Sequence, residues 1–177
     1  MISLLKTVSP ENAEGVVKDV YDGFSEKLGK LPNVIRFHSA SPRVYGYLMG
    51  LMNEFATHST IDPILQAFLR AIVSHREGGE YCVKFQSYLL QANGVSQEAI
   101  NQTLHNPESV PLTDKQKQLL LFAIRIVEGQ AENIPEALEK LHNMGWSDEE
   151  IYELCFLGGL QKGMVPLING FNVKHDF

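Results

Sequence analysis

The sequence predicts an all-α fold, a single helical bundle over residues 1–177. Three observations support this prediction. Apolar residues recur at three- and four-residue steps, Ser, Thr, Pro and Gly punctuate the chain as helix caps do, and no stretch shows the sustained alternation of a strand. We expect roughly eight to ten helices, with boundaries uncertain by about 2–4 residues.

The helices of the first half are predicted from their start and stop residues. Ser9 followed by Pro10 is typical of an N-cap and a first helical position, and Gly29 is a typical stop. Asp62 and Pro63 start another helix, whose apolar residues predict a core-facing stripe: Ile64, Leu65, Phe68, Leu69, Ile72 and Val73. We expect helices over residues 10–28, around 35–37, over 42–57, and from 63 to the joint at Gly78-Gly79.

The second half contains two capping boxes. Thr113 with Gln116, and Ser147 with Glu150, each have the spacing in which two side chains satisfy two helix N-terminal N–H groups. The glycine pair at 158–159 predicts a break between the last two helices. We expect helices over residues 80–93, 97–104, 114–128, 135–144, 148–158 and 161–172.

Composition limits the classes of function. Apolar residues make up 44% of 177 residues, an ordinary value for a globular protein. The formal net charge of −6 argues against nucleic acid or an anionic membrane as partner. No apolar run reaches the ~18 residues of a membrane span, and the N-terminus does not resemble a signal peptide. We therefore expect a cytoplasmic protein with reduced thiols.

The cysteines are too few and too far apart for a zinc site or a disulfide framework, so we expect no metal and no other cofactor. Cys155 lies between apolar neighbours and is interpreted as a core residue. Cys82 is the candidate nucleophile. It falls in the first turn of a helix, where the dipole favours a thiolate, whereas the nearby Glu77 and Glu80 oppose one. The sequence leaves that contest open, as it leaves open whether Cys82 is simply a buried core residue.

The neighbours of that cysteine are candidate pocket residues. His75 is either a substitute base or a histidine at a helix C-terminus, where the dipole stabilises its charge. Glu77 and Glu80 are either acid–base groups or solvated surface carboxylates. Gln86 either orients a ligand or satisfies a backbone group, and Tyr81 is interpreted mainly as a packing residue.

Four sequence blocks carry a resemblance to a known family: LPNVIRFHSASP, LQAFLRAIVSHREGGEYCVKFQSYLLQANGVSQEAI, LTDKQKQLLLFAIRIV and GWSDEEI. Their order and spacing resemble the carboxymuconolactone decarboxylase and alkyl hydroperoxidase D-like family, and its peroxidase-related branch most of all. The resemblance places the family core at about residues 31–151. It implies an all-helical fold and a homo-oligomer.

The resemblance also exposes what this chain lacks. Peroxidase members of the family use a Cys-x-x-Cys pair, a histidine four residues after the second cysteine, and a glutamate twelve residues before the first. The corresponding positions here are Gly79, Cys82, Gln86 and Ala67, so only the second cysteine is kept. Decarboxylase members also place a histidine at the position of Gln86, which cannot titrate.

Three functions remain open at this stage. The first is a relay-deficient member of the family that binds a small ligand, or catalyses an altered reaction, in a pocket near Cys82. The second is a single-cysteine peroxidase that uses Cys82 as nucleophile and an external reductant. The third is a non-catalytic oligomeric interaction protein. If the protein is an enzyme, the resemblance implies a peroxidase-like oxidoreductase or a decarboxylase-like lyase.

Overall fold

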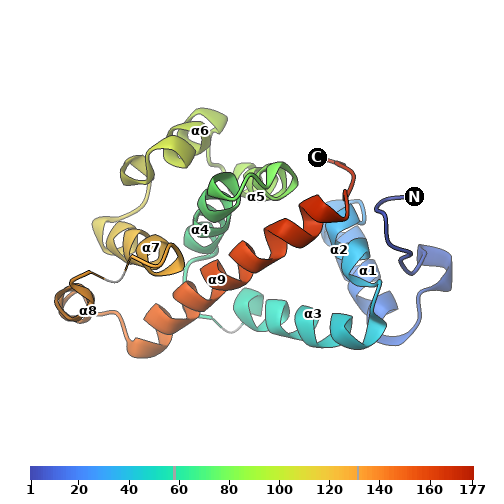
Figure 1. Cartoon of the computed structure of the whole chain (residues 1–177), viewed down its shortest axis with the longest axis horizontal. Helices are drawn as coiled ribbons and strands as arrows, with labels where there is room; N and C mark the ends of the chain where they lie inside the picture. The colour runs from blue at the N-terminus through green and yellow to red at the C-terminus, as the bar shows by residue number, and fades with distance from the viewer. Residues whose placement is uncertain (58, 131) are drawn as a thin grey trace. The chain divides into compact units, whose positions relative to one another are not determined.

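The computed structural model describes residues 1–57, 59–130 and 132–177 (Figure 1). These ranges contain helices and no strand, so the all-α prediction is confirmed, and the nine α-helices that they hold agree with the expected number. The elements are the 3₁₀ helices η1 (Pro10–Asn12) and η2 (Pro107–Ser109) and the α-helices α1 (Gly15–Leu28), α2 (Asn33–His38), α3 (Pro42–Thr57), α4 (Pro63–Arg76), α5 (Glu80–Ala92), α6 (Gln97–His105), α7 (Asp114–Val127), α8 (Ile134–Asn143) and α9 (Asp148–Gly170).

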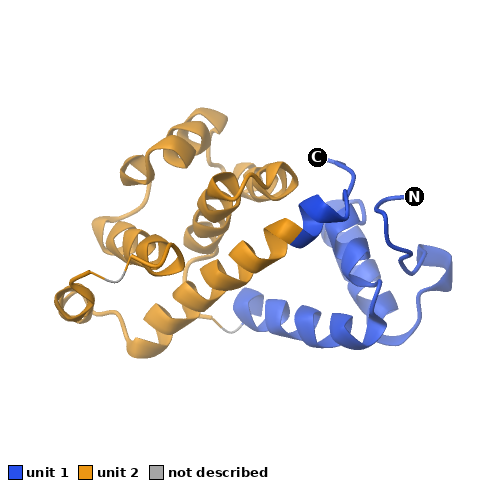
Figure 2. Cartoon of the chain, viewed as in Figure 1, with its two compact units in different colours: residues 1–58, 167–177 blue, residues 59–166 orange. Residues whose placement is uncertain are grey.

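The chain divides into two compact units (Figure 2). Unit 1 comprises residues 1–58 and 167–177, and unit 2 comprises residues 59–166. In unit 1 the first and last segments of the chain bond to each other, because Leu4 N–H donates to Phe171 O at 2.9 Å and Lys174 N–H donates to Ile2 O at 2.9 Å. The single-domain prediction stays a prediction.

The core of unit 2 forms around α4, which packs against α5, α6 and α7. Of the six residues predicted to face the core from this helix, five are buried and Ile64 is partly buried. Truncating one buried leucine of this kind to alanine typically costs about 2–5 kcal/mol. The helix that carries several site residues is therefore held firmly by its apolar face.

The predicted caps of unit 2 are confirmed. The Asp62 side chain accepts a hydrogen bond from Ile64 N–H at 2.8 Å, and both capping boxes form, with the Thr113 and Ser147 hydroxyls each accepting from the N–H three residues later. Gly94 ends α5 in the left-handed region at φ +84°, which glycine adopts without strain. Local residue chemistry thus sets these helix ends.

The first predicted helix start is wrong. Ser9 and Pro10 begin only the short 3₁₀ helix η1, after which Ala13 and Glu14 are extended. Gly15 then takes φ +52°, a conformation that interrupts any continuous helix. The α-helix therefore begins at Gly15, about one and a half turns later than the capping pattern predicts.

The predicted break at residues 158–159 is also wrong, because α9 continues through it to Gly170. Gly158 serves close packing instead of a turn. A Cβ at Gly158 would lie 2.8 Å from Val127 Cγ2 and 3.2 Å from Leu69 Cδ2. The absent side chain lets α9 approach α4 and α7, and a sequence pattern alone does not distinguish this use of glycine from a helix stop.

Candidate functional site

The site begins at the tight joint between α4 and α5. Gly78 takes φ +68°, and Gly79 N–H donates to Ser74 O at 2.7 Å. A Cβ on Gly79 would lie 2.8 Å from Val165 Cγ1 and 3.3 Å from Ser74 O. Since Val165 belongs to α9, that helix excludes a larger side chain at Gly79, the predicted counterpart of the first relay cysteine.

Cys82 is the third residue of α5 and is only 4% exposed. Three polar side chains from two other helices surround its thiol: Arg70 and Ser74 from α4 and Gln161 from α9. They form one hydrogen-bonded chain. Arg70 Nε donates to Gln161 Oε1 at 3.0 Å, Gln161 Nε2 donates to Ser74 Oγ at 2.9 Å, and Ser74 Oγ donates to Arg70 O at 2.7 Å. Cys82 therefore faces a fixed polar network.

Burial raises the pKa of the Cys82 thiol above its usual value. The Arg70 guanidinium, and hydrogen bonding with Gln161 and Ser74, lower this pKa but do not outweigh burial. Burial also lowers the pKa of the Arg70 guanidinium, which nevertheless stays charged because arginine titrates far above neutral pH. At neutral pH the site therefore combines a protonated thiol with a cation.

The predicted relay positions lie on or beside α4 and α5, the helices that carry Arg70, Ser74 and Cys82. Ala67, Arg70 and Ser74 follow one another at steps of three and four residues, which puts them on one face of α4. Cys82 and Gln86 are one turn apart on α5. Gln86 is 1% exposed, and its Oε1 is enclosed without a hydrogen-bond partner. Gln86, the predicted counterpart of the relay histidine, is thus a buried amide whose Oε1 has no hydrogen-bond partner.

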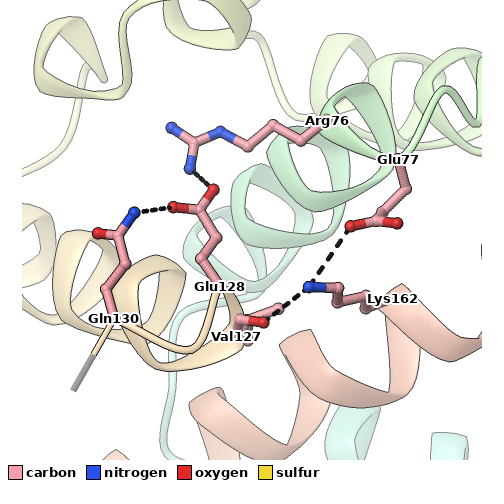
Figure 3. A network of polar contacts seen from close by, with 6 residues as sticks. All are labelled: Arg76, Glu77, Val127, Glu128, Gln130 and Lys162. Carbon is pink, nitrogen blue, oxygen red and sulfur yellow. Dashed lines mark hydrogen bonds and ion pairs between the residues drawn. The ribbon is translucent and has the colours of Figure 1, made fainter.

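The charged candidates beside the joint lie at the surface instead. Glu77 is exposed and pairs with Lys162, whose Nζ lies 3.6 Å from Glu77 Oε1 and also donates to Val127 O at 3.0 Å. In the same network (Figure 3), Arg76 pairs with Glu128, which accepts a hydrogen bond from Gln130. These contacts tie the ends of α4 and α7 to α9. Glu77 therefore has a structural role, because its carboxylate pairs with Lys162 of α9.

The remaining candidates are divided between surface and core. His75 is exposed, and its ring meets that of His105 edge-on, with the ring centroids 5.1 Å apart. Glu80 is exposed, whereas Tyr81 is 3% exposed. The structure thus brings Cys82 and Gln86 together on one buried face and leaves His75, Glu77 and Glu80 on the surface. The roles assigned to these residues stay predictions.

Cys155 has different surroundings. It is partly buried on α9 and packs against the apolar core. Burial is the cause that raises its pKa to about 11. Both cysteines are free thiols. Cys155 behaves as a small core residue, as the sequence predicts.

In the part of the chain outside residues 58 and 131, no group of three or more His, Cys, Asp and Glu side chains is placed to hold a metal ion. Over the same ranges, no helix is both long and apolar enough to cross a membrane.

Sequence reasoning missed three members of the network: Arg70, Ser74 and Gln161. A detectable pattern existed for two of them, because Arg70 and Ser74 are polar residues one turn apart within a helix that has a strong apolar stripe. Buried polar residues at such positions need partners. No local pattern identifies Gln161, which comes from a helix 87 residues away from Ser74 in sequence.

Comparison with solved structures places the fold. An uncharacterized peroxidase-related protein from Silicibacter sp. TM1040 is 17% identical with a TM-score of 0.81, over 98% of this chain and 88% of that one. A second uncharacterized peroxidase-related protein, described as an alkylhydroperoxidase AhpD core, from Ralstonia eutropha JMP134, is 15% identical with a TM-score of 0.87, over 99% and 93%.

A third similar structure is the debrominase Bmp8 in its apo form, which is 17% identical with a TM-score of 0.77, over 99% of this chain and 92% of that one. A cysteine-to-alanine variant of Bmp8 in complex with 2,3,4-tribromopyrrole is similar to the same degree. No protein-family model matches the chain, and no curated protein has a significantly similar sequence. The chain therefore has the AhpD-like, peroxidase-related fold, and the predicted resemblance is confirmed at the level of the fold.

Proposed function

We propose that this chain, which has the AhpD-like fold, is a relay-deficient member of the carboxymuconolactone decarboxylase and alkyl hydroperoxidase D-like family that binds a small ligand beside Cys82. One observation carries the proposal: a network of Arg70, Ser74 and Gln161 encloses the single remaining relay thiol. A buried polar network of this kind is expensive to maintain in a core. A ligand that hydrogen-bonds to this network accounts for that cost.

Two features count against turnover by a dithiol relay. A side chain on Gly79 would meet Val165, so the position of the first relay cysteine is occupied by packing. Cys82 also has its pKa raised by burial, whereas the attacking species in peroxide reduction is the thiolate. With Ala67 and Gln86 at the other two positions, the chain supplies neither of the relay's acid–base groups.

A single-cysteine peroxidase is the second candidate, and the position of Arg70 favours it. Its charge lowers the pKa of the Cys82 thiol against the effect of burial. In this reaction the thiolate sulfur attacks one peroxide oxygen, forming a sulfenic acid and releasing an alcohol or water after proton transfer. Two equivalents of an external thiol then reduce the sulfenic acid to the thiol, forming a disulfide of the reductant and water.

Two measurements separate these functions. Peroxide loss with excess dithiol is followed for the natural protein, for Cys82→Ser, and for Cys155→Ser as the matched control. Native mass spectrometry of the protein as purified then detects a bound small molecule. We expect peroxide loss near background in all three proteins, and a bound molecule in the natural one. Turnover by the natural protein that Cys82→Ser abolishes and Cys155→Ser retains would establish the peroxidase instead.

We also propose a cytoplasmic homo-oligomer. Both cysteines are free thiols, as a reducing compartment requires. Tyr152 and Phe156 are exposed on α9 and stack with their ring centroids 5.9 Å apart, and exposed aromatic pairs of this kind are typical of interfaces. Light scattering at micromolar concentration should give a multiple of the 19.8 kDa chain. A monomer mass would contradict this proposal.

A further inference from the structure

Arg70 is a partly buried cation whose charge has no carboxylate partner among the residues that the structure describes. Over the described residues, its guanidinium hydrogen-bonds to the neutral Gln161, and the one titratable group that acts on it is the Cys82 thiol. Because burial raises the pKa of that thiol, it is protonated at neutral pH and supplies no negative charge. Ser74, Gln86 and Gln161 are neutral. A cation in such surroundings loses hydration without compensation.

The site also holds hydrogen-bonding groups that are not used. Arginine has five N–H donors, and in the described chain one of them, on Nε, is bonded to a side chain, Gln161. Gln86 Oε1 accepts no hydrogen bond from any described residue. This oxygen is one of three enclosed, unpartnered side-chain atoms there, with Tyr45 Oη and Thr103 Oγ1. Arg70 is only partly buried, whereas Gln86 is 1% exposed.

The family relay has a glutamate near the position of Arg70, and this chain has alanine there. Ala67 lies three residues before Arg70 on the same face of α4, at the position of the relay glutamate. A carboxylate at residue 67 would lie one turn from the guanidinium, the spacing at which helical ion pairs form. Alanine leaves a methyl group there. Among the described residues no carboxylate is recorded against the guanidinium, so a negative charge that balances Arg70 would come from another molecule.

We infer that the site takes a small organic monocarboxylate, whose carboxylate group binds the Arg70 guanidinium, with Gln86 on the adjacent helix α5 as a second polar contact. The inference deepens the proposed function and rests on it. A guanidinium binds a planar carboxylate through two parallel N–H···O bonds, a geometry that a spherical anion does not match. Ligand binding in this way balances the charge of Arg70, and a carboxylate oxygen can also accept from Gln86 Nε2, whereas Gln86 Oε1 is itself an acceptor and gains no partner from a carboxylate.

Matched small probes test the inference. Acetate, propionate and benzoate are titrated into the natural protein, each against its neutral amide and against chloride at equal ionic strength, with calorimetry and thermal unfolding as readouts. We expect a saturable rise in Tm and measurable heat with at least one carboxylate, and neither with its amide nor with chloride. Equal effects of carboxylate and amide, or of carboxylate and chloride, would overturn the inference.

Variants then locate the binding. Arg70→Met removes the charge and keeps much of the length of the side chain. It should raise the Kd for the carboxylate at least about tenfold, the scale of a lost charge-assisted hydrogen bond. Arg70→Lys keeps the charge without the fork and should bind with intermediate strength. Arg43→Met, an exposed arginine of α3, is the matched control and should bind as the natural protein does. Natural affinity in Arg70→Met would contradict the inference.

A substitute variant and native mass spectrometry distinguish a failure of this inference from a failure of the proposed function. If Arg70→Met does not fold, Gln86→Leu takes its place, since it removes the amide at similar volume and should weaken carboxylate binding severalfold. A bound neutral molecule, found by native mass spectrometry while no carboxylate binds, would overturn the carboxylate inference and leave the proposed function standing. Peroxide turnover that depends on Cys82, with no bound molecule, would overturn the proposed function itself.

Discussion

The two cysteines of this chain have the same thiol chemistry in two different surroundings. Both are free, and burial raises the pKa of both. Cys155 packs against the apolar core, with burial as the cause of its shifted pKa. Cys82 is more deeply buried, yet Arg70, Ser74 and Gln161 act on it from two other helices. Burial therefore does not distinguish the surroundings of the two cysteines, whereas the polarity of their neighbours does.

Restoring the relay residues should produce the largest change, a rise in peroxide turnover. This rise should depend on Cys82 and not on Cys155. Ala67→Glu, Gly79→Cys and Gln86→His, combined with Val165→Ala, should raise peroxide turnover about 10²–10⁴-fold, the usual range of general acid–base catalysis. Arg70 lies one turn from the carboxylate introduced at residue 67 and can stabilise it. Peroxide loss with a dithiol reductant is the measurement, and adding Cys82→Ser should return it to background.

Val165→Ala is part of that design because a Cβ at Gly79 meets Val165 Cγ1 at 2.8 Å. Without it, the three-residue variant should be less stable by about 1–3 kcal/mol, as overpacked cores are. Denaturant unfolding of the variants with and without Val165→Ala compares the two free energies. Equal stability would mean that α9 moves away from the joint freely, and that the relay position is not closed by packing.

Alkaline pH should reveal the surroundings of Cys155. Its folded pKa of about 11 lies above the ordinary value of 9.0, so the unfolded chain loses this proton first as pH rises. The stability that Cys155 contributes is present below about pH 9 and is lost as pH rises to about 11, by about 2–3 kcal/mol. The free energy of unfolding of Cys155→Ala should fall less over this range. If the free energies of unfolding of the two proteins fell in parallel with pH, the raised pKa of Cys155 would be contradicted.

Thiol labelling should show the polar surroundings of Cys82. Arg70→Met removes the positive charge that lowers the pKa of this thiol, so alkylation of Cys82 by iodoacetamide should become severalfold slower at mildly alkaline pH. Cys155 should react at an unchanged rate and serves as the reference within each sample. Peptide mass analysis measures both rates, and Arg43→Met controls for a general loss of charge. An equal slowing at both cysteines would indicate a change in stability instead.

Mild oxidation should have the smallest effect, because the two thiols should not join. A disulfide needs Cα atoms within about 7 Å. Gln161 is the α9 residue beside Cys82, and Cys155 lies six residues earlier, about 9 Å along the helix axis. Mass analysis after oxidation should show both cysteines unbridged. A Cys82–Cys155 disulfide would contradict this prediction and show that the two thiols come into contact in solution.

The relay positions show how far sequence comparison reaches into the site. The spacing of Ala67, Gly79, Cys82 and Gln86 identified the buried face of α4 and α5 that carries them. It offered no account of why Gly79 must be glycine, because the side chain that excludes a larger residue is Val165 on α9. Nor did it separate the exposed Glu77 and Glu80 from buried groups, since all of them adjoin the joint in sequence.

The all-α class and most helix ends follow from the sequence alone, because caps and apolar stripes act over a few neighbouring residues. Tertiary structure decided the continuity of α9 through Gly158, and the meeting of Arg70, Ser74, Gln161 and Cys82. The physical reason is the same in both cases. Close packing and buried hydrogen bonds join residues far apart in the chain, and no local pattern records which distant side chain fills the space or completes the bond.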